Sequence, residues 1–406
     1  MGSEIKNDAP PAVTEAMRHD IYPDMTHDER ARLNFLTSTY RVLSQRVAPG
    51  NKLAFEQVVE PAFKRDHGRA PSDRHEVRKS MNANSFHGLW GALRRSFMEI
   101  RQMTGQEIVL RQVDDLSKRA GAINDQHNRL HLNPDVEIPR YVGEVDHHCM
   151  PGSYYRELVD GDVSPAANYD MGLFVTTSGT IGPLNDGGGR AIASWLKSEH
   201  PAFQPKRVLD IGVAVGHSLF GLAKAFPETQ FTAIDVASPM LRYAAARAHS
   251  LGLDNIEFIQ ASGEDLTQFE DASFDMVMTS IFLHEHSGSS LPKLLKEANR
   301  VLGDGGLMLH LEQPQYSDDM PPYEQFIRDW DAYNNNEPFW SAMHAIDLTE
   351  LLSELGFHKT RIFQAGLQAE KSLEATAQKQ KFEEHGRSPA WNAYGAWKDG
   401  ERATNA

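Results

Sequence analysis

The strongest constraint on this chain is a regular alternation of short apolar runs and helical segments between residues 207 and 312. The runs have strand length, and we place them at 207–211, 230–235, 256–260, 274–280 and 307–312. Strands that alternate with helices at this spacing predict a parallel sheet covered on both faces. We therefore predict a doubly wound, mostly parallel α/β sheet, in which a ligand lies beyond the carboxyl ends of the strands.

The remaining sequence divides into regions of different character. Residues 1–27 are polar and predict a flexible tail, and residues 28–190 predict a mainly helical region that caps the substrate site. Apolar residues recur there at helical spacing, from Leu33 to Val47 and again from Leu89 to Met103. Residues 191–400 form the predicted sheet domain, and an aromatic-rich insertion at 313–345 is expected to act as a lid.

Composition and charge argue against several classes of partner. The 406-residue chain has a formal net charge of −15, which predicts that it does not bind nucleic acid. No apolar run is long enough to span a membrane, and the N-terminus does not read as a signal peptide. Cys149 is the only cysteine, so no disulfide can form within one chain, and we expect a cytoplasmic protein.

A glycine-containing turn follows the first of these strands. In the segment VLDIGVAVG at 208–216, Gly212 and Gly216 allow a tight turn into a helix whose N–H groups can face a ligand. The dinucleotide pattern is absent because its third glycine is missing. Asp235 ends the second strand about 20 residues later, where an acid can bind a ribose diol. The alternatives are a turn without a ligand and, for Asp235, a helix start near Ser238.

Three further segments give the pattern a specific resemblance. They are SGEDL at 262–266, SFDMV at 273–277 and LGDGGLMLHLE at 302–312. In this order, after the glycine turn and the acid of the second strand, they resemble the class I S-adenosylmethionine (SAM)-dependent methyltransferase family. The resemblance covers residues 190–312 well and 345–398 loosely. It implies SAM as cofactor and an antiparallel strand pair at 357–364 and 391–398 that completes the sheet.

The resemblance also implies roles for residues of the glycine turn. Asp210 would hold the methionine amino group, Gly212 and Gly216 would frame the cofactor, and Asp235 would bind the ribose. The family usually has another glycine at position 214, where this chain has Ala214. A slight shift of the backbone would accommodate its methyl group.

Later positions complete the implied cofactor site. Ser262 stands where the family often has an aspartate beside the adenine amino group. Glu264 or the backbone around Gly263 would then make that contact. Thr279 and Ser280 would lie beneath the methionine portion of the cofactor.

His284 is the candidate catalytic residue. It belongs to the segment SIFLHEH at 280–286, which is similar to the LHDW stretch of small-molecule O-methyltransferases, whose histidine is a general base. A neutral imidazole can accept a proton near pH 7; a histidine that only packs is the alternative. Adjacent side chains diverge, so we predict no metal bound by His284, Glu285 and His286.

The pair His147 and His148 lies in a second histidine-containing segment, DHHCM at 146–150. One interpretation is a pocket wall in which a histidine orients the substrate. The other, which we favour, is a local turn with one buried histidine.

Together these features predict an enzyme that transfers a methyl group from SAM to a small organic acceptor, with oxygen favoured over nitrogen, carbon or sulfur. Two alternatives stay open: a SAM-fold protein that binds SAM without methylating, and a nicotinamide-dependent oxidoreductase. A homodimer through the N-terminal region is compatible with the sequence. The sequence does not identify the acceptor.

Overall fold

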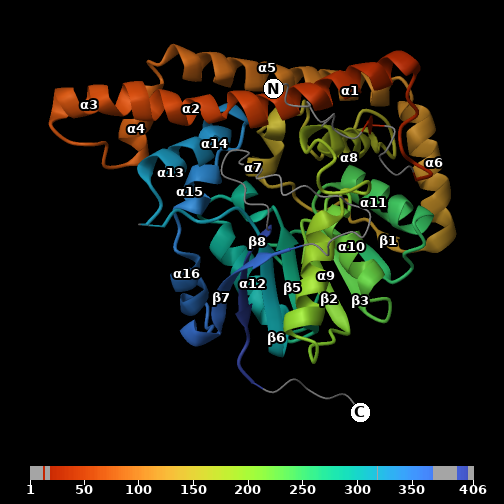
Figure 1. The fold of residues 1–406 in the computed structure, drawn as a ribbon. Helices are drawn as coiled ribbons and strands as arrows, with labels where there is room; N and C mark the ends of the chain where they lie inside the picture. The colour runs from red at the N-terminus through yellow and green to blue at the C-terminus, as the bar shows by residue number, and fades with distance from the viewer. Residues whose placement is uncertain (1–11, 14–18, 318, 369–390, 401–406) are drawn as a thin grey trace, which may run out of the picture.

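The computed structural model describes residues 12–13, 19–317, 319–368 and 391–400 of the chain. It has two parts, a sheet with helices on both faces and a helical region that lies across one end of the sheet (Figure 1). The long helices α1 and α5 run side by side along the top of this helical region. The predicted fold class is confirmed.

The sheet contains all the predicted strands, and its order is β1-β4-β3-β2-β5-β6-β8-β7. Its strands are β1 (Leu130–His131), β2 (Arg207–Ile211), β3 (Gln230–Asp235), β4 (Ile256–Gln260), β5 (Phe274–Ser280), β6 (Leu302–Leu311), β7 (Ile362–Leu367) and β8 (Trp391–Trp397). Strands β1 to β6 pair in parallel, whereas β8 is antiparallel to both β6 and β7. The chain order reverses between β2 and β5, which creates the switch point where ligands bind in such sheets.

Alternating side chains of each central strand enter two different cores. Met276 and Met278 of β5 pack with one face's helices, and Val277 between them packs on the opposite face. The first face is covered by α9 (Gly187–Glu199), α10 (His217–Ala225) and α11 (Ser238–Ser250), and the second by α12 (Leu291–Val301) and α16 (Leu348–Glu354). Because both faces are buried, the strands read as nearly continuous apolar runs.

The two long helices of the helical region begin at residues that cap their N-termini. Thr26 caps α1 through a capping box with Glu29, and Asn84 caps α5 by accepting two backbone N–H bonds. The region contains α1 (His27–Val42), α2 (Pro49–Ala54), α3 (Glu60–His67), α4 (Arg74–Met81), α5 (Ser85–Leu110), α6 (Val113–His127), α7 (Arg140–Gly143) and α8 (Ser164–Thr176). The predicted insertion forms α13 (Pro322–Arg328), α14 (Trp330–Asn334) and α15 (Trp340–His344).

The structure differs from the sequence prediction at the N-terminus. Residues 1–11 and 14–18 of the predicted flexible tail lie outside the described part of the chain. His19, Ile21 and Met25 are buried, so the prediction of a flexible tail is wrong for residues 19–25. Strand β1 was also missed. It is only two residues long and pairs with β4 at the edge of the sheet, so no periodicity marks it.

Some of the apolar residues whose spacing predicts α5 lie on the exposed face of this helix. Leu89 and Met103 are 58% and 59% exposed, whereas Trp90 and Ile108 are fully buried. The helix was predicted, but its buried face was not, because the partner helices α1 and α8 are remote in sequence.

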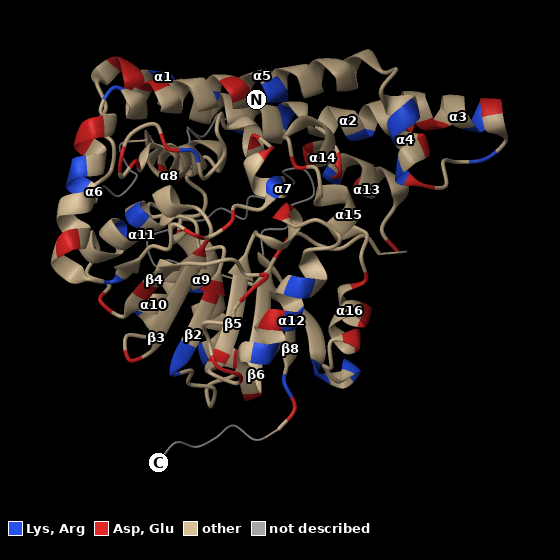
Figure 2. Cartoon of the chain, turned by 180° about the vertical axis from the view of Figure 1, so that it is seen from behind, with Lys and Arg blue, Asp and Glu red and all other residues tan. Residues whose placement is uncertain are grey.

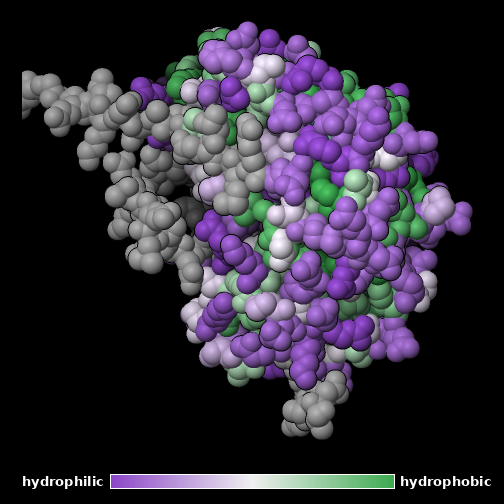
Figure 3. Space-filling view, turned by 90° about the vertical axis from the view of Figure 1, so that its right-hand side faces the viewer, coloured by the Kyte–Doolittle hydropathy of each residue, from purple (hydrophilic) through white to green (hydrophobic). Residues whose placement is uncertain are grey.

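Basic and acidic residues alternate along the described helices and loops, and neither sign is confined to one part of the chain (Figure 2). The side that carries α6 is mainly hydrophilic (Figure 3). In the described part of the chain, none of the helices combines the length and the apolar character that crossing a bilayer requires.

The buried carboxylate of Asp170 joins the helical region to the sheet domain. From α8, its Oδ2 lies 2.9 Å from Nε2 of His19 and accepts a 2.8 Å hydrogen bond from the Tyr243 hydroxyl of α11. Its Oδ1 lies 2.6 Å from Nε2 of His217, the first residue of α10. Burial opposes ionisation, but the Arg247 guanidinium and the two histidines hold the pKa of Asp170 well below its usual range.

Asp170→Asn is expected to lower the free energy of unfolding by about 3–5 kcal/mol, because Arg247 would then be buried without its counter-charge. The matched change Asp115→Asn breaks a largely exposed pair with Arg119 and is expected to cost about 1 kcal/mol or less. Denaturant unfolding of both variants measures the difference. Equal stabilities of the two variants would show that Asp170 does not hold the two parts together.

Candidate active site

The turn between β2 and α10 has a left-handed backbone at several residues. Gly212 and Gly216 have φ values of 75° and 82°, and Ala214 between them has a φ of 46°. A Cβ atom on Gly212 would lie 2.4 Å from the Phe282 ring. Gly212 is therefore required both by the backbone and by the close approach of Phe282, whereas the alanine at 214 is accommodated with its φ positive.

Asp235 fixes this turn from the end of β3. Its Oδ2 accepts a 2.9 Å hydrogen bond from the Ala214 N–H, and its Oδ1 accepts a 2.9 Å bond from the Ala237 N–H. Helix α11 begins at Ser238 and has no side-chain cap, so Asp235 is not its N-cap. A carboxylate has about four acceptor positions, so further hydrogen bonds to a ligand diol are available.

Asp210 is a second carboxylate beside the turn, and unlike Asp235 it is buried. It is 3% exposed, and its Oδ1 has no hydrogen-bond partner. Burial, with the nearby Asp235 carboxylate as a second cause, raises the pKa of Asp210 well above its usual range. An uncompensated buried carboxylate is costly, and a cationic ligand group would remove that cost. The residues here therefore fit the ammonium and ribose groups of SAM.

The loop after β4 is held by its own contacts. Ser262 Oγ accepts a 3.2 Å bond from the Glu264 N–H, and Glu264 Oε1 accepts a 2.6 Å bond from the Tyr141 hydroxyl. A Cβ atom on Gly263 would lie 2.6 Å from Ile211, so the loop packs closely against β2. Tyr141 belongs to α7, and sequence reasoning missed this contact from the helical region.

The two residues at the end of β5 have different surroundings. Ser280 Oγ lies 2.7 Å from Ser218 Oγ in the first turn of α10, so it faces the glycine turn. Thr279 is fully buried, and its Oγ1 lies 2.8 Å from Nδ1 of His310 in β6. The expected position of Thr279 beneath the cofactor is therefore wrong, because successive strand residues point to opposite faces.

His284 is held by Glu312, the residue that follows β6. It is 1% exposed, and its Nδ1 lies 2.9 Å from Glu312 Oε1, while Glu312 Oε2 accepts a 3.0 Å bond from the Leu283 N–H. Burial favours the neutral imidazole, but the Glu312 carboxylate outweighs it and raises the pKa of His284 to about 10. This differs from the expected neutral imidazole, because Glu312 lies on another strand and its approach was not predicted.

The segment containing His147 and His148 faces His284 across the site. His147 is 1% exposed, with its Nε2 3.1 Å from Glu285 Oε2, and His148 Nδ1 lies 2.7 Å from Glu337 Oε1. The segment is a 3-10 turn, His147–Cys149, in which His147 is buried and His148 is partly exposed, so the favoured interpretation of a local turn with one buried histidine is confirmed. That one of these histidines orients a substrate stays a prediction. Glu337, between α14 and α15, was not predicted because nothing in its local sequence marks it.

The side chains of 284–286 diverge as predicted. His284 pairs with Glu312, Glu285 faces the two histidines at 147 and 148, and His286 Nδ1 lies 3.1 Å from Ser290 Oγ. The side chains of these three residues therefore do not converge on one point where a metal ion could be bound by all of them.

Two groups thus meet at the carboxyl end of the sheet. One is the glycine turn with the carboxylates of Asp210 and Asp235 beside it, and the other is a mostly buried cluster of histidines and glutamates. Residues 208–306 match the family model described as a methyltransferase domain. Together the fold, the order of these motifs and this match define a class I SAM-dependent methyltransferase domain, whose cofactor is SAM.

Several curated proteins are similar in sequence to this part of the chain. The ubiquinone/menaquinone biosynthesis C-methyltransferase of Brucella anthropi is 34% identical over 143 residues, which cover 34% of this chain and 51% of the relative. A fatty-acid O-methyltransferase of Mycolicibacterium smegmatis is 32% identical over 125 residues, covering 30% of this chain and 43% of the relative. The chain thus spans about half the length of the curated relatives it matches.

A solved structure with a similar fold is the phosphoethanolamine N-methyltransferase 2 of Haemonchus contortus in complex with SAM. It is 19% identical, covers 57% of each chain and has a TM-score of 0.41.

Gly212→Ala is expected to weaken SAM binding by about tenfold or more, because the new methyl group meets Phe282 and strains the left-handed backbone. Gly252→Ala is the matched control: its φ is 71°, but nothing lies within 4 Å of the added atom. Calorimetric titration with SAM should distinguish the two variants. Equal SAM affinities would mean that the turn at Gly212 does not shape the cofactor site.

Proposed function

We propose that this protein transfers a methyl group from SAM to a small organic acceptor, with oxygen as the favoured acceptor atom. The observation that carries the proposal is the pair of carboxylates beside the glycine turn, the buried Asp210 and the partly buried Asp235. This arrangement suits a ligand with a cationic amino acid at one end and a ribose diol at the other.

The proposed cofactor-binding residues surround the turn. Asp210 would accept the methionine ammonium group, and Asp235 would accept the ribose hydroxyls with the lone pairs that Ala214 and Ala237 leave free. The remaining proposed positions are Gly212, Gly216, Ser262, Gly263, Glu264 and Ser280. Since Tyr141 holds the Glu264 side chain, the helical region contributes to the adenine side of the site.

His284 is the proposed catalytic residue at the acceptor side. Its Nδ1 is held by Glu312, so the ring is fixed, and its Nε2 is directed toward Glu285 at 4.0 Å. SAM supplies an already activated methyl group, so the task of the protein is to orient the acceptor, exclude water and handle its proton. Because its pKa is raised to about 10, the His284 ring is protonated near neutral pH and would donate a hydrogen bond to an acceptor oxygen rather than take a proton from it. A cationic donor suits an oxygen acceptor better than an ammonium group, and oxygen is therefore the acceptor atom that we favour.

The test is release of S-adenosylhomocysteine when the protein is incubated with SAM and a panel of alcohols, phenols, amines, thiols and acidic carbons. The proposal expects release with at least one oxygen acceptor and a thermal shift with SAM but not with NAD. Binding of SAM without release across the panel would favour the binding-module alternative, and a thermal shift with NAD alone would favour the oxidoreductase.

Two variants separate cofactor binding from catalysis in this assay. Asp235→Asn should weaken SAM binding about 10- to 100-fold, since a charge-assisted hydrogen-bond pair is lost. His284→Ala should leave the SAM affinity unchanged and lower the turnover number about 100-fold or more. The exposed change Asp271→Asn, in a surface pair with Arg300, serves as the control. A His284→Ala enzyme with full turnover would remove His284 from the mechanism.

We also propose that the protein forms a homodimer through α1 and α5. Large apolar side chains are exposed along the outer faces of these two adjacent helices, a pattern typical of an interaction surface. They are Phe35 at 61%, Leu89 at 58%, Ile100 at 37%, Met103 at 59% and Leu110 at 38% exposure. Such a stripe is self-complementary, so a second copy related by a two-fold axis can cover it.

The double change Leu89→Ser and Met103→Ser is expected to convert the dimer to a monomer, because it removes apolar area at the centre of the stripe. Leu158→Ser is the control, with a side chain that is 54% exposed but lies outside the stripe. Light scattering coupled to size-exclusion chromatography gives the mass of each. A monomeric wild-type protein would contradict the proposal.

A further inference from the structure

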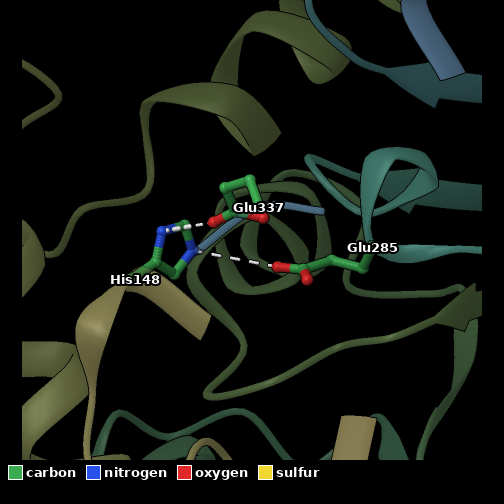
Figure 4. A group of neighbouring side chains, drawn as sticks. All are labelled: His148, Glu285 and Glu337. Atoms are coloured by element: carbon green, nitrogen blue, oxygen red, sulfur yellow. Dashed lines mark ion pairs between the residues drawn. The ribbon is translucent and has the colours of Figure 1, made fainter. Parts of the chain in front are cut away.

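We infer that His148, Glu285 and Glu337 bind a divalent transition-metal ion beside the cofactor site. One ligand atom from each of these residues lies within 4.8 Å of the other two (Figure 4). Ligand atoms around a single Zn²⁺-like ion lie roughly 3 Å apart, given bonds of about 2 Å. Small side-chain rotations therefore suffice to bring the three atoms to one ion.

The three residues come from separate parts of the chain. His148 lies in the 3-10 turn His147–Cys149 of the helical region, and Glu285 lies in the 3-10 turn Leu283–Glu285 after β5. Glu337 comes from the lid, between α14 and α15, and its side chain is fully buried. An ion at this point would connect the helical region, the lid and the sheet domain.

The donor set suits such an ion. One imidazole and two carboxylates provide the nitrogen and oxygen donors typical of Zn²⁺, Fe²⁺, Mn²⁺ or Co²⁺ sites. His148 stands between the two acids, with Nδ1 2.7 Å from Glu337 Oε1 and Nε2 3.8 Å from Glu285 Oε1. Two carboxylates in a dry site repel each other, and a divalent cation compensates both charges.

The surroundings of Glu285 provide a second, independent observation. Its Oε2 and the Nε2 of His147 are both buried and lie 3.1 Å apart, yet neither atom makes a hydrogen bond. Tyr154 donates a 3.2 Å hydrogen bond to Glu285 Oε1 from another side. Glu285 Oε2 therefore has an ion-pair contact with His147 but no hydrogen bond, and a cation bound at Glu285 would compensate this buried oxygen.

Three protein ligands leave coordination positions open, as in catalytic metal sites. Glu285 is the next residue after His284, so an ion bound here lies beside the proposed acceptor site. Resting on the proposed function, this assigns the acceptor to the class of oxygen chelators, such as catechols or hydroxy acids. The ion would lower the pKa of a coordinated hydroxyl and fix its oxygen.

The full-length protein is first treated with a chelator and dialysed, then titrated with Co²⁺ without SAM. Equilibrium dialysis is expected to give one Co²⁺ per chain, with visible absorption bands that Zn²⁺ abolishes by displacement. If the folded protein retains no Co²⁺, the inference is overturned. The same result is expected if the cluster binds an amine acceptor instead of an ion. The titration contains no SAM, so its result does not depend on whether the protein transfers a methyl group. A failure of the metal inference can therefore be distinguished from a failure of the proposed function.

Variants locate the ion. Glu337→Gln is expected to weaken Co²⁺ binding about 100-fold or more. Loss of a residue that only orients a metal ligand typically weakens metal binding by about 10- to 100-fold, so a larger loss identifies Glu337 as a ligand itself. Glu324→Gln, a partly exposed glutamate of the same lid that pairs with Lys52, should bind Co²⁺ as the wild type does. His148→Gln is the second variant if Glu337→Gln does not fold. Wild-type affinity in a folded variant of either ligand would contradict the site.

Discussion

The buried charge of Asp170 is the interaction on which the arrangement of the molecule depends. An ionised carboxylate in a dry interior is stable only when its oxygens are fully partnered, and here the partners come from the N-terminal segment, α10 and α11. Its bond to His217 reaches the residue directly after Gly216. The same contact therefore seats the helical region on the sheet and fixes the glycine turn.

The consequence is that the carboxyl end of the sheet is covered. Residues that would otherwise face solvent, among them His284, Glu285 and Asp210, are almost fully buried. In a low-dielectric interior, their mutual interactions are stronger than they would be in water. This explains why Glu312 raises the pKa of His284 while burial lowers that of His286 to about 3, two residues further along.

Sequence reasoning predicted the sheet well and its surroundings poorly. Strands with both faces buried are apolar throughout and carry a local signal, so β2 to β6 could be placed directly. The outer face of α5 shows the opposite case, because an apolar stripe predicts a helix but not which side meets a partner. Thr279 and Ser280 are adjacent in sequence, yet only Ser280 reaches the glycine turn, since the pleat turns neighbouring side chains apart.

The sequence by itself determined the fold class and the glycine turn, because the spacing of strands, glycines and Asp235 is encoded within short segments whose geometry is local. Only the tertiary structure decided what surrounds that turn. His148, Glu285 and Glu337 lie far apart along the chain, and they meet because the helical region and the insertion at 313–345 pack over the end of the sheet. The charge state and the contacts of a buried group depend on such distant neighbours, which no local pattern specifies.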